Sequence, residues 1–455
     1  MDPGLEVCIV GSRALFEACR RAEFPLPPEP EDLDLAWGLD PDRGREYLEG
    51  LGLEVTGTQG NQDRGTIAVQ LSGKRVEITS YRGGGADIAE RIAKDAQLRD
   101  MSIGALYWKL WTDQIADPMD GLSDWGFGSI RACGSAADRI QEHPIRALRY
   151  LRRATELGFH LDTTTRKGIE ASAAFVGREA LPEAVAEEIR KVLARCSSPG
   201  AFFQLAQEVR LLEEILPEIA PVFDGRPAGR IHFHPEISQA LHMVLALRSA
   251  AALADEQQLE TRERMLLLMA VLCHDLGKGK TRTEDMPSHP GHEGGGVEIV
   301  EGLFRRLPAL GSKYMERFCK VSARTHLLLI KLRMMRAGTL VDLWEQDLRG
   351  LERDFENLAR VVRCDRDGRL HPSDLGLPCP PQIHPAHAGL ELQERVHADL
   401  LALDSCMRSV SGEASARLHP DDPKALKQHL RTARCEALAH SGFLDIKGRK
   451  EEGHH

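Results

Sequence analysis

The sequence predicts an α+β protein, in which a head of mixed strands and helices precedes a long all-helical body. Three observations lead to this prediction. The first 125 or so residues alternate short strand-like runs with helical stretches. From about Asp138 onward strand patterns nearly vanish, and helical periodicity dominates to the C-terminus. At 455 residues the chain is also too long for a single hydrophobic core, so we expect about two to four domains.

Composition limits the classes of function. Hydrophobic residues make up 42% and charged residues 28%, which is typical of a globular protein. A net charge of −10 disfavours broad binding to polyanions and leaves a local basic face as the route to nucleic acid. The longest apolar run, near Met265 to Cys273, is too short to cross a bilayer. The ten cysteines occur singly, without a CxxC pair, as expected for reduced thiols. With no secretory signal visible, we expect a cytoplasmic protein.

The head begins with recognisable local elements. Residues 7–10 form a short apolar run that predicts a strand, and residues 14–21 predict a helix after Gly11 and Ser12. A proline-rich loop then leads into residues 32–37, where polar and apolar residues alternate as in a half-buried strand. Residues 66–71 and 75–81 predict a hairpin.

Three carboxylates are placed to act together. Asp32 and Asp34 are two residues apart on a predicted strand, so their side chains share a face, and Glu77 lies on a later strand. Such a cluster suits two Mg²⁺ ions that clamp a nucleoside triphosphate. Gly11 and Ser12, between strand and helix, would present backbone N–H groups to the phosphates. Alone, each feature is more often a solvated edge or a plain turn, but their order is that of a polymerase-β-like nucleotidyltransferase core.

Three downstream segments make the resemblance specific. Residues 99–103, 117–124 and 142–149 are similar to the RRDFT, DPxxGxxDL and EDPLRxLR segments of class II tRNA nucleotidyltransferases and poly(A) polymerases. The resemblance implies template-independent addition of C and A to the 3′ end of tRNA from CTP and ATP. Asp32 and Asp34 would hold Mg²⁺, with Glu77 assisting as the third catalytic carboxylate. The resemblance implies nucleotide binding by Gly11, Ser12, Arg99, Asp100, His143, Arg146 and Arg149.

The head departs from the family pattern at several positions. Ser12 replaces a glycine, and Leu15 stands where an arginine is usual. Leu98 and Gly104 replace an arginine and an asparagine. His143 replaces the aspartate that reads the incoming base together with the arginine here at Arg146. A neutral imidazole offers one donor and one acceptor, so base choice can differ.

Alternatives to full CCA addition therefore stay open. The first is a phosphohydrolase whose degenerate head only binds RNA or nucleotide. The second is a non-catalytic RNA-binding or assembly protein. The third keeps transfer but makes another product, such as oligo(A) or partial CC.

A basic helix follows the head. Pro144 suits the first turn of a helix that runs to about Leu157. One broad face of this helix carries four arginines, namely Arg146, Arg149, Arg152 and Arg153. This face would contact nucleotide phosphate and tRNA backbone, or it is a solvated, ion-paired surface.

The helical body contains a candidate metal site. His274 and Asp275 end a strongly apolar helix, and Gly277 is expected to terminate it in the left-handed conformation. Together with His242 and Asp365, from other predicted helices, they can converge in a bundle to hold a divalent metal. Such a metal activates water and orients a phosphate, and Lys278 would steady the phosphate. His292 and His326 lie nearby in sequence for a second metal, which the chemistry does not require.

This stretch carries a second resemblance. The segments 234–242, 272–279 and 291–292 are similar to the HD domain of the multifunctional CCA proteins. That resemblance implies 2′,3′-cyclic phosphodiesterase, 2′-nucleotidase and phosphatase activities, with Ni²⁺, Mn²⁺ or Mg²⁺ at His242, His274, Asp275 and Asp365, the catalytic pair being His274 and Asp275. It also implies tRNA as partner, through its 3′ end and acceptor arm.

The expected domains are a head at 1–125, a helical neck at 126–225, the HD domain at 226–375 and a helical tail at 376–455. Two roles are open for the tail, contact with the tRNA elbow and formation of a homodimer.

Overall fold

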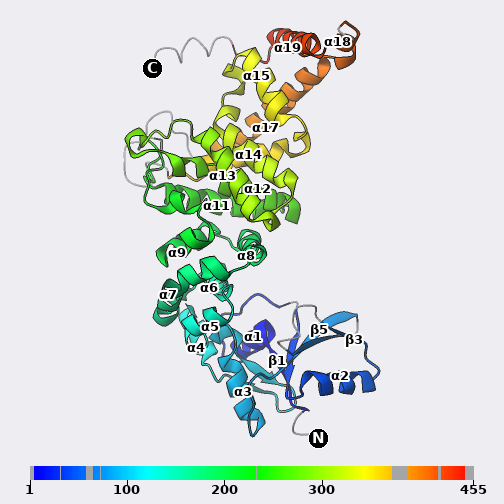
Figure 1. Cartoon of the computed structure of the whole chain (residues 1–455), viewed down its shortest axis with the longest axis vertical. Helices are drawn as coiled ribbons and strands as arrows, with labels where there is room; N and C mark the ends of the chain where they lie inside the picture. The colour runs from blue at the N-terminus through cyan, green and yellow to red at the C-terminus, as the bar shows by residue number, and fades with distance from the viewer. Residues whose placement is uncertain are drawn as a thin grey trace. The chain divides into compact units, whose positions relative to one another are not determined.

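The computed structural model describes residues 5–30, 32–57, 65–71, 73–231, 233–370, 388–418 and 422–445. The chain forms two compact units, one of residues 1–181 with 208–214 and one of 182–207 with 215–455. Figure 1 shows a mixed sheet with helices in the first unit and helices alone in the second, so the α+β prediction is confirmed. The four expected domain boundaries remain predictions. Among the described helices, none is both long and apolar enough to span a membrane.

The first unit is built on a seven-stranded sheet with the order β3-β4-β5-β2-β1-β6-β7. Its strands are β1 (Val7–Val10), β2 (Asp34–Trp37), β3 (Val55–Gly57), β4 (Thr66–Leu71), β5 (Lys74–Ser80), β6 (Tyr107–Lys109) and β7 (Gln114–Ala116). Strands β2 and β5 are parallel, and the other neighbours are antiparallel. The predicted strand at 7–10 and the predicted hairpin, now β4 and β5, are confirmed.

Helices cover this sheet because apolar residues project from it into two clusters. Ile92 and Ala96 of α3 (Ile88–Gln97) pack with residues of β1, β2 and β6. Leu48 of α2 (Pro41–Gly50) packs with residues of β2, β4 and β5. Helix α1 (Gly11–Arg21) follows β1 directly and buries Leu15 and its neighbours. The end of β1 and the start of α1 are thereby fixed beside β2.

Strand β2 differs from the half-buried strand that the alternation predicted. It begins at Asp34, so Asp32 lies just before it, and its last two residues, Ala36 and Trp37, are both buried. The alternation fails because β2 is an inner strand between β1 and β5, with apolar clusters on both faces. Only its N-terminal end is open to solvent.

The remainder of the first unit is mainly helical. It contains η3 (Ser102–Gly104), α4 (Gly121–Phe127), β8 (Ser129–Ile130), α5 (Ala136–Glu142), α6 (Arg146–Leu157), β9 (His160–Leu161) and α7 (Thr163–Glu179). Strands β8 and β9 form a two-stranded parallel sheet. The pattern beyond Asp138 predicted almost no strand, and β9 was missed because two residues carry no periodicity.

The second unit is a helical bundle around α12. Its helices are α8 (Pro182–Arg195), α9 (Gly200–Glu208), η4 (Ala220–Phe223), α11 (Gln239–Glu256), α12 (Thr261–Cys273), η5 (Leu276–Lys280), η6 (Thr283–Asp285), α13 (His292–Arg306), η7 (Pro308–Leu310), α14 (Lys313–Leu329), η8 (Leu332–Met334), α15 (Ala337–Leu343), η9 (Trp344–Leu348), η10 (Glu352–Asp354), α16 (Phe355–Asp367), α17 (Ala388–Ser409), α18 (Gly412–Leu418) and α19 (Pro423–His440). The short helix α10 (Leu212–Ile215) has three of its four residues in the first unit. Every residue of α12 from Met265 to Cys273 is buried. A helix that is apolar all round belongs inside a bundle, and α11, α14 and α16 all contact it.

Candidate active sites

The carboxylates of the head meet at the open end of β2. Parallel pairing of β2 and β5 sets Asp34 directly beside Glu77. Gly11 has a φ of +67°, and a Cβ there would lie 3.2 Å from Oδ2 of Asp34. A glycine is therefore needed for the start of α1 to lie against this carboxylate. Desolvation and the nearby charges of Glu77 and Asp32 raise the pKa of Asp34 above its ordinary value.

This head site is open and incomplete by itself. Asp32 and Asp34 are exposed, and the Glu77 side chain is 41% exposed and lies 3.2 Å from the Arg75 guanidinium. The described residues contain three groups of side chains that could share a metal ion, and none of these groups is in the head. Mg²⁺ commonly completes its shell with water and phosphate oxygens. The three carboxylates, crowded by like charge, fit that use.

The departure at Leu15 has a structural reason. The Leu15 side chain is only 2% exposed and belongs to the buried face of α1. A cation at this position would face the core, not a phosphate. Ser12, one residue past the glycine, is exposed at the start of α1.

Asp100 is the centre of an ion-pair network in the first unit. Nε of Arg146 lies 2.6 Å from its Oδ1, and Nη1 of Arg149 lies 2.8 Å from its Oδ2. Burial opposes ionisation of Asp100, but the two arginines outweigh it and lower its pKa. Arg146 is 4% exposed at its side chain and also binds Glu142 at 2.6 Å. Its donors are thus turned inward, whereas Arg149 and Asp100 keep a partly exposed edge.

The other head residues likewise include some with internal partners and some that are exposed. Arg99 donates to Asp95 at 3.1 Å and to the Tyr107 hydroxyl at 2.9 Å, well inside the unit. His143 is exposed at the C-terminal end of α5. On α6, Arg152 and Arg153 both bind Glu156, at 3.0 and 2.9 Å, so these two arginines belong to an ion-paired face.

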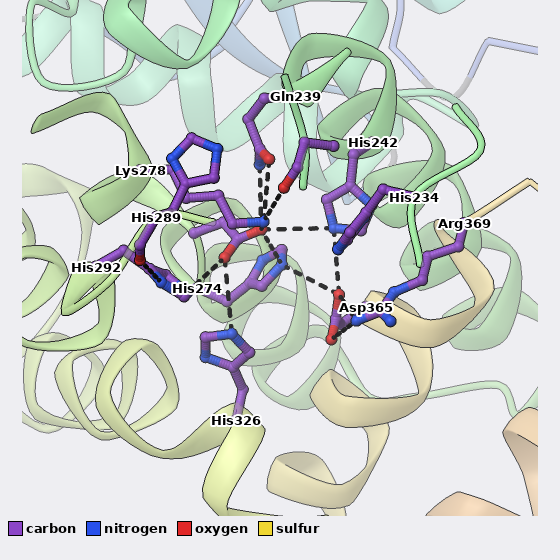
Figure 2. Close-up of polar contacts among 12 residues, drawn as sticks. His234, Gln239, His242, His274, Lys278, His289, His292, His326, Asp365 and Arg369 are labelled. Carbon is purple, nitrogen blue, oxygen red and sulfur yellow. Dashed lines mark hydrogen bonds and ion pairs between the residues drawn. The ribbon is translucent and has the colours of Figure 1, made fainter. Parts of the chain in front are cut away.

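The helical body brings the four predicted metal ligands together. His274 caps the C-terminal end of α12 and Asp275 follows it, while His242 comes from α11 and Asp365 from α16. Because both helices pack on α12, the side chains converge at its end (Figure 2). Nε2 of His242 lies 3.2 Å from Oδ1 of Asp365, and Nε2 of His274 lies 3.3 Å from Oδ2 of Asp275. All four residues are at most 3% exposed.

Two further histidines reach the same centre from the opposite side. Nε2 of His292, the first residue of α13, lies 3.4 Å from Oδ1 of Asp275. Nε2 of His326, on α14, lies 3.6 Å from the same oxygen. The two groups suited to a metal are thus His242, His274 and Asp365 on one side, and Asp275, His292 and His326 on the other. The sequence left the second group open.

The imidazoles are oriented for coordination. Nδ1 of His274 faces the Val271 carbonyl at 2.6 Å. Nδ1 of His292 faces the His289 carbonyl at 2.8 Å, and Nδ1 of His326 faces the Ala323 carbonyl at 3.1 Å. A carbonyl can only accept, so Nδ1 carries the proton and a neutral ring leaves its Nε2 lone pair toward the centre. Burial lowers the pKa of His326 to about 4, which keeps that ring neutral.

Several atoms at this centre lack partners within the described part of the chain. Nε2 of His242, His274 and His292 and Oδ1 of Asp275 are buried without a hydrogen bond. Buried polar atoms are normally paired, so unpaired ones need an explanation. A bound divalent metal would supply it, and the nitrogen and carboxylate donors fit such an ion.

The predicted role of Gly277 was wrong. Its φ is not left-handed, and it lies within η5 instead of ending α12 in the predicted conformation. A Cβ at Gly277 would meet the His292 carbonyl oxygen at 1.8 Å and the Gly296 nitrogen at 2.6 Å. The glycine is required because α13 packs directly on η5, and this close packing positions His292.

Sequence reasoning missed residues that hold the ligands. Gln239 donates to Oδ2 of Asp275 at 3.1 Å. Lys278, which the sequence predicted to steady a phosphate, lies 2.7 Å from the same oxygen. Oε1 of Glu236 lies 2.7 Å from His234 and 3.2 Å from Nδ1 of His242. Burial opposes ionisation of Glu236, but the two adjacent imidazoles outweigh it and lower its pKa to about 2. No periodicity marks these positions, because their partners are distant in sequence.

Comparison with known families agrees with both parts of the chain. Residues 24–131 match the family described as the Poly A polymerase head domain, and residues 240–362 match the HD domain. The chain is 32% identical to a multifunctional CCA protein of Stenotrophomonas maltophilia over 68% of this chain and 74% of that protein. It is 31% identical to the multifunctional CCA protein of Nitrosococcus oceani over 78% and 82% of the two chains.

Solved structures show the same fold. A CCA-adding enzyme in complex with CTP superposes with a TM-score of 0.61 at 15% identity, covering 98% of this chain and 89% of that one. A tRNA nucleotidyltransferase complexed with a primer tRNA and an ATP analogue gives a TM-score of 0.53 at 17% identity, covering 88% and 96%. At these identities the likeness is one of fold.

Proposed function

The chain belongs to the family of multifunctional CCA proteins, and from that premise we propose that it matures and repairs the 3′ end of tRNA with two separate active sites. The head adds C and A from CTP and ATP without a template. The HD domain removes phosphate from RNA ends as a 2′,3′-cyclic phosphodiesterase, 2′-nucleotidase and phosphatase. The tRNA acceptor arm and 3′ end are the proposed partner of both sites.

In the head, Asp32, Asp34 and Glu77 would hold the metal of the transfer reaction. Mg²⁺ at this position would neutralise the triphosphate and favour attack of the tRNA 3′-hydroxyl on the α-phosphate, with pyrophosphate leaving. Gly11 and Ser12 would bring backbone N–H groups to the phosphates at the start of α1. The ionised form of Asp34, whose pKa is raised by desolvation and by its acidic neighbours, would be stabilised by this positive charge.

The nucleotide-binding residues would act in two layers. Arg99 and Arg146 hold the network from inside, because their guanidinium groups are engaged with Asp95 and Asp100. Asp100, Arg149 and the exposed His143 form the edge that a nucleotide can reach. In this arrangement Arg146 contributes to base choice by fixing Asp100, and His143 supplies the variable contact.

In the HD domain, His242, His274, Asp275 and Asp365 would hold a divalent metal, with His292 and His326 available for a second one. Ni²⁺, Mn²⁺ or Mg²⁺ at this centre would lower the pKa of a bound water and polarise the phosphate. Lys278 and Gln239 fix the orientation of Asp275. Glu236 orients His242 from behind, a role that carboxylates often have beside metal-bound imidazoles.

Two observations support the proposal: Asp34 lies beside Glu77 in the head, and four imidazoles face Asp275 in the body. The alternative of a head that only binds RNA is less favoured. It has to treat the paired carboxylates and the glycine beside them as accidental.

Labelled CTP and ATP test the head directly. Transcripts of tRNA that lack CCA, lack only the final A, or are complete are incubated with Mg²⁺ and each nucleotide. We expect ordered addition to the first two transcripts only, and loss of all addition in Asp34→Asn. Incorporation that is unordered, or that persists in this variant, would contradict the proposed transfer.

A further inference from the structure

A pocket opens over the HD metal centre, and part of its wall is formed by residues that are not proposed metal ligands. Its volume is about 380 Å³, and its floor includes Asp275, His292, His326 and Asp365. Pockets that bind small ligands fall in a range of about 300–1,000 Å³. The space is therefore enough for one nucleoside beside the phosphate that reacts, but not for a large structured RNA.

One wall comes from the loop between residues 227 and 238. The loop is closed at its base by an isolated bridge between Pro227 and Ser238 and by a 2.7 Å hydrogen bond from Ala228 N to the Ile237 carbonyl. Ile237 has a φ of +65°, which is unfavourable for a β-branched residue. Such strain is tolerated where the surroundings fix the backbone, as the contacts of Pro227 and Ala228 do at the base of the loop.

This loop presents an aromatic ring and a cation to the pocket. Phe233 lines the pocket and remains 54% exposed. Its backbone N–H donates to the Arg230 carbonyl at 2.9 Å, which ties Phe233 to Arg230. Arg230 also lines the pocket, and its Nε donates to the Ser288 hydroxyl at 3.3 Å.

The three cations of the pocket differ in what neutralises them. Lys278 is paired with Asp275, and Arg369 with Asp365. For Arg230, the described residues offer no carboxylate within 4.0 Å. Arg230 is thus an exposed cation at the pocket, available to an anion from outside. An exposed ring in the same pocket as a guanidinium without a carboxylate partner suits a ligand that has both a base and a phosphate.

We propose that this pocket is a subsite for the terminal nucleoside of an RNA 3′ end, with the base stacked on Phe233 and the phosphodiester on its 5′ side bound by Arg230. The inference rests on the proposed phosphohydrolase activity and names the substrate it prefers. The terminal 2′,3′-cyclic phosphate then lies over Asp275. The HD domain selects nucleotide ends over other phosphate esters through contacts to the base, which is stacked and not read by hydrogen bonds.

The first test compares substrates with and without a base. Hydrolysis of adenosine 2′,3′-cyclic phosphate and of glycerol 1,2-cyclic phosphate is measured for the full chain with Mn²⁺. Base stacking on an aromatic side chain corresponds to about 1–3 kcal/mol. We therefore expect Phe233→Ala to raise KM about tenfold or more for the nucleotide, with kcat nearly unchanged, and to leave the glycerol compound unaffected. Phe233→Trp should restore the wild-type KM.

The second test addresses the phosphate contact. Hydrolysis of a dinucleotide ending in a 2′,3′-cyclic phosphate is compared with that of the mononucleotide. We expect Arg230→Ala to lower kcat/KM for the dinucleotide about fivefold, as for a charge-assisted contact at the surface, and to leave the mononucleotide unchanged. Arg282→Ala is the matched control, because this exposed arginine does not line the pocket.

A readout independent of turnover is the binding of adenosine 2′-monophosphate by calorimetry, which Phe233→Ala should weaken to a similar degree. Equal hydrolysis of the adenosine and glycerol compounds by the wild type, unaffected by Phe233→Ala, would overturn the subsite and leave the phosphohydrolase intact. Absence of hydrolysis of any cyclic phosphate by the wild type would instead remove the proposed function itself. These two failures are distinguishable because the glycerol compound reports on the metal centre alone.

Discussion

The carboxylate site of the head and the metal centre of the HD domain differ in how complete each is before a ligand binds. The head offers two exposed aspartates and a half-exposed glutamate of like charge. The HD centre is buried, its two aspartates are matched by cations and imidazoles, and its rings are held by backbone carbonyls. Under the proposed function the head would therefore need the nucleotide to assemble its metal site, whereas the side chains of the HD centre are already brought together.

This difference follows from the elements that carry the two sites. The head residues lie at the end of a strand, beside a loop and a helix start, where substrate has to enter. The HD ligands lie on helices packed around α12, so their positions are fixed by the core. In the proposed function, one chain would thus combine an open site for exchange of nucleotides with a buried site that retains a metal.

The largest expected effect is a clean separation of the two activities. His274→Ala removes one of the proposed metal ligands, and we expect phosphohydrolase activity to fall at least about a thousandfold while nucleotide addition is kept. Asp34→Ala should give the reverse pattern. Both activities are measured on one preparation of each variant. Loss of both in either variant would indicate coupled sites or misfolding, which a melting curve separates.

The next effect concerns the stability of the metal-free protein. Asp275→Ala leaves Lys278 buried without its carboxylate, and breaking such a pair costs about 3–5 kcal/mol. Glu77→Gln changes an exposed carboxylate and should alter the free energy of unfolding by less than about 0.5 kcal/mol. Urea unfolding of the two variants beside the wild type measures both. Equal destabilisation would contradict the contrast between a preorganised and an open site.

Metal affinity should show the same contrast without catalysis. Calorimetry of Mn²⁺ binding without nucleotide should detect the HD centre, and Glu236→Gln should weaken it about 10- to 100-fold through the orientation of His242. The head should bind Mg²⁺ measurably only when CTP or ATP is present. Tight binding at the head in their absence, abolished by Asp34→Asn, would mean that this site is also preformed.

The smallest effect is on the dependence of stability on pH. The folded-state pKa of Glu236 is about 2, below its ordinary value of 4.5, so its contribution is present above pH 4.5 and is lost as pH falls toward 2. Glu236→Gln should make the stability less dependent on pH between 4.5 and 2. The pKa of Asp34 is raised instead, so its ionised form destabilises the folded protein. Asp34→Asn should therefore stabilise the protein slightly at neutral pH. Thermal midpoints measured across pH 2–7 would contradict both assignments if the variants follow the wild-type curve.

Local patterns were sufficient for the strand at 7–10, the hairpin and the His274-Asp275 pair at the end of an apolar helix, which all follow from periodicity and residue chemistry. The burial of both Ala36 and Trp37 in β2 did not follow, because it depends on which strands flank β2. Gly277 was misread for the same reason, since its neighbour is His292 on another helix. Gln239 and Glu236 lack any local signal, and only the packed bundle shows what they hold.

The most direct test of the account is extension of a blocked tRNA end. A tRNA transcript that lacks CCA and ends in a 2′,3′-cyclic phosphate is incubated with Mg²⁺, Mn²⁺, CTP and ATP. We predict that the wild type clears the end and then adds CCA. His274→Ala should extend only a transcript with free hydroxyls, and Asp34→Ala should clear the blocked end without extending it. Extension of the blocked transcript by His274→Ala, or none by the wild type on either transcript, would contradict the account.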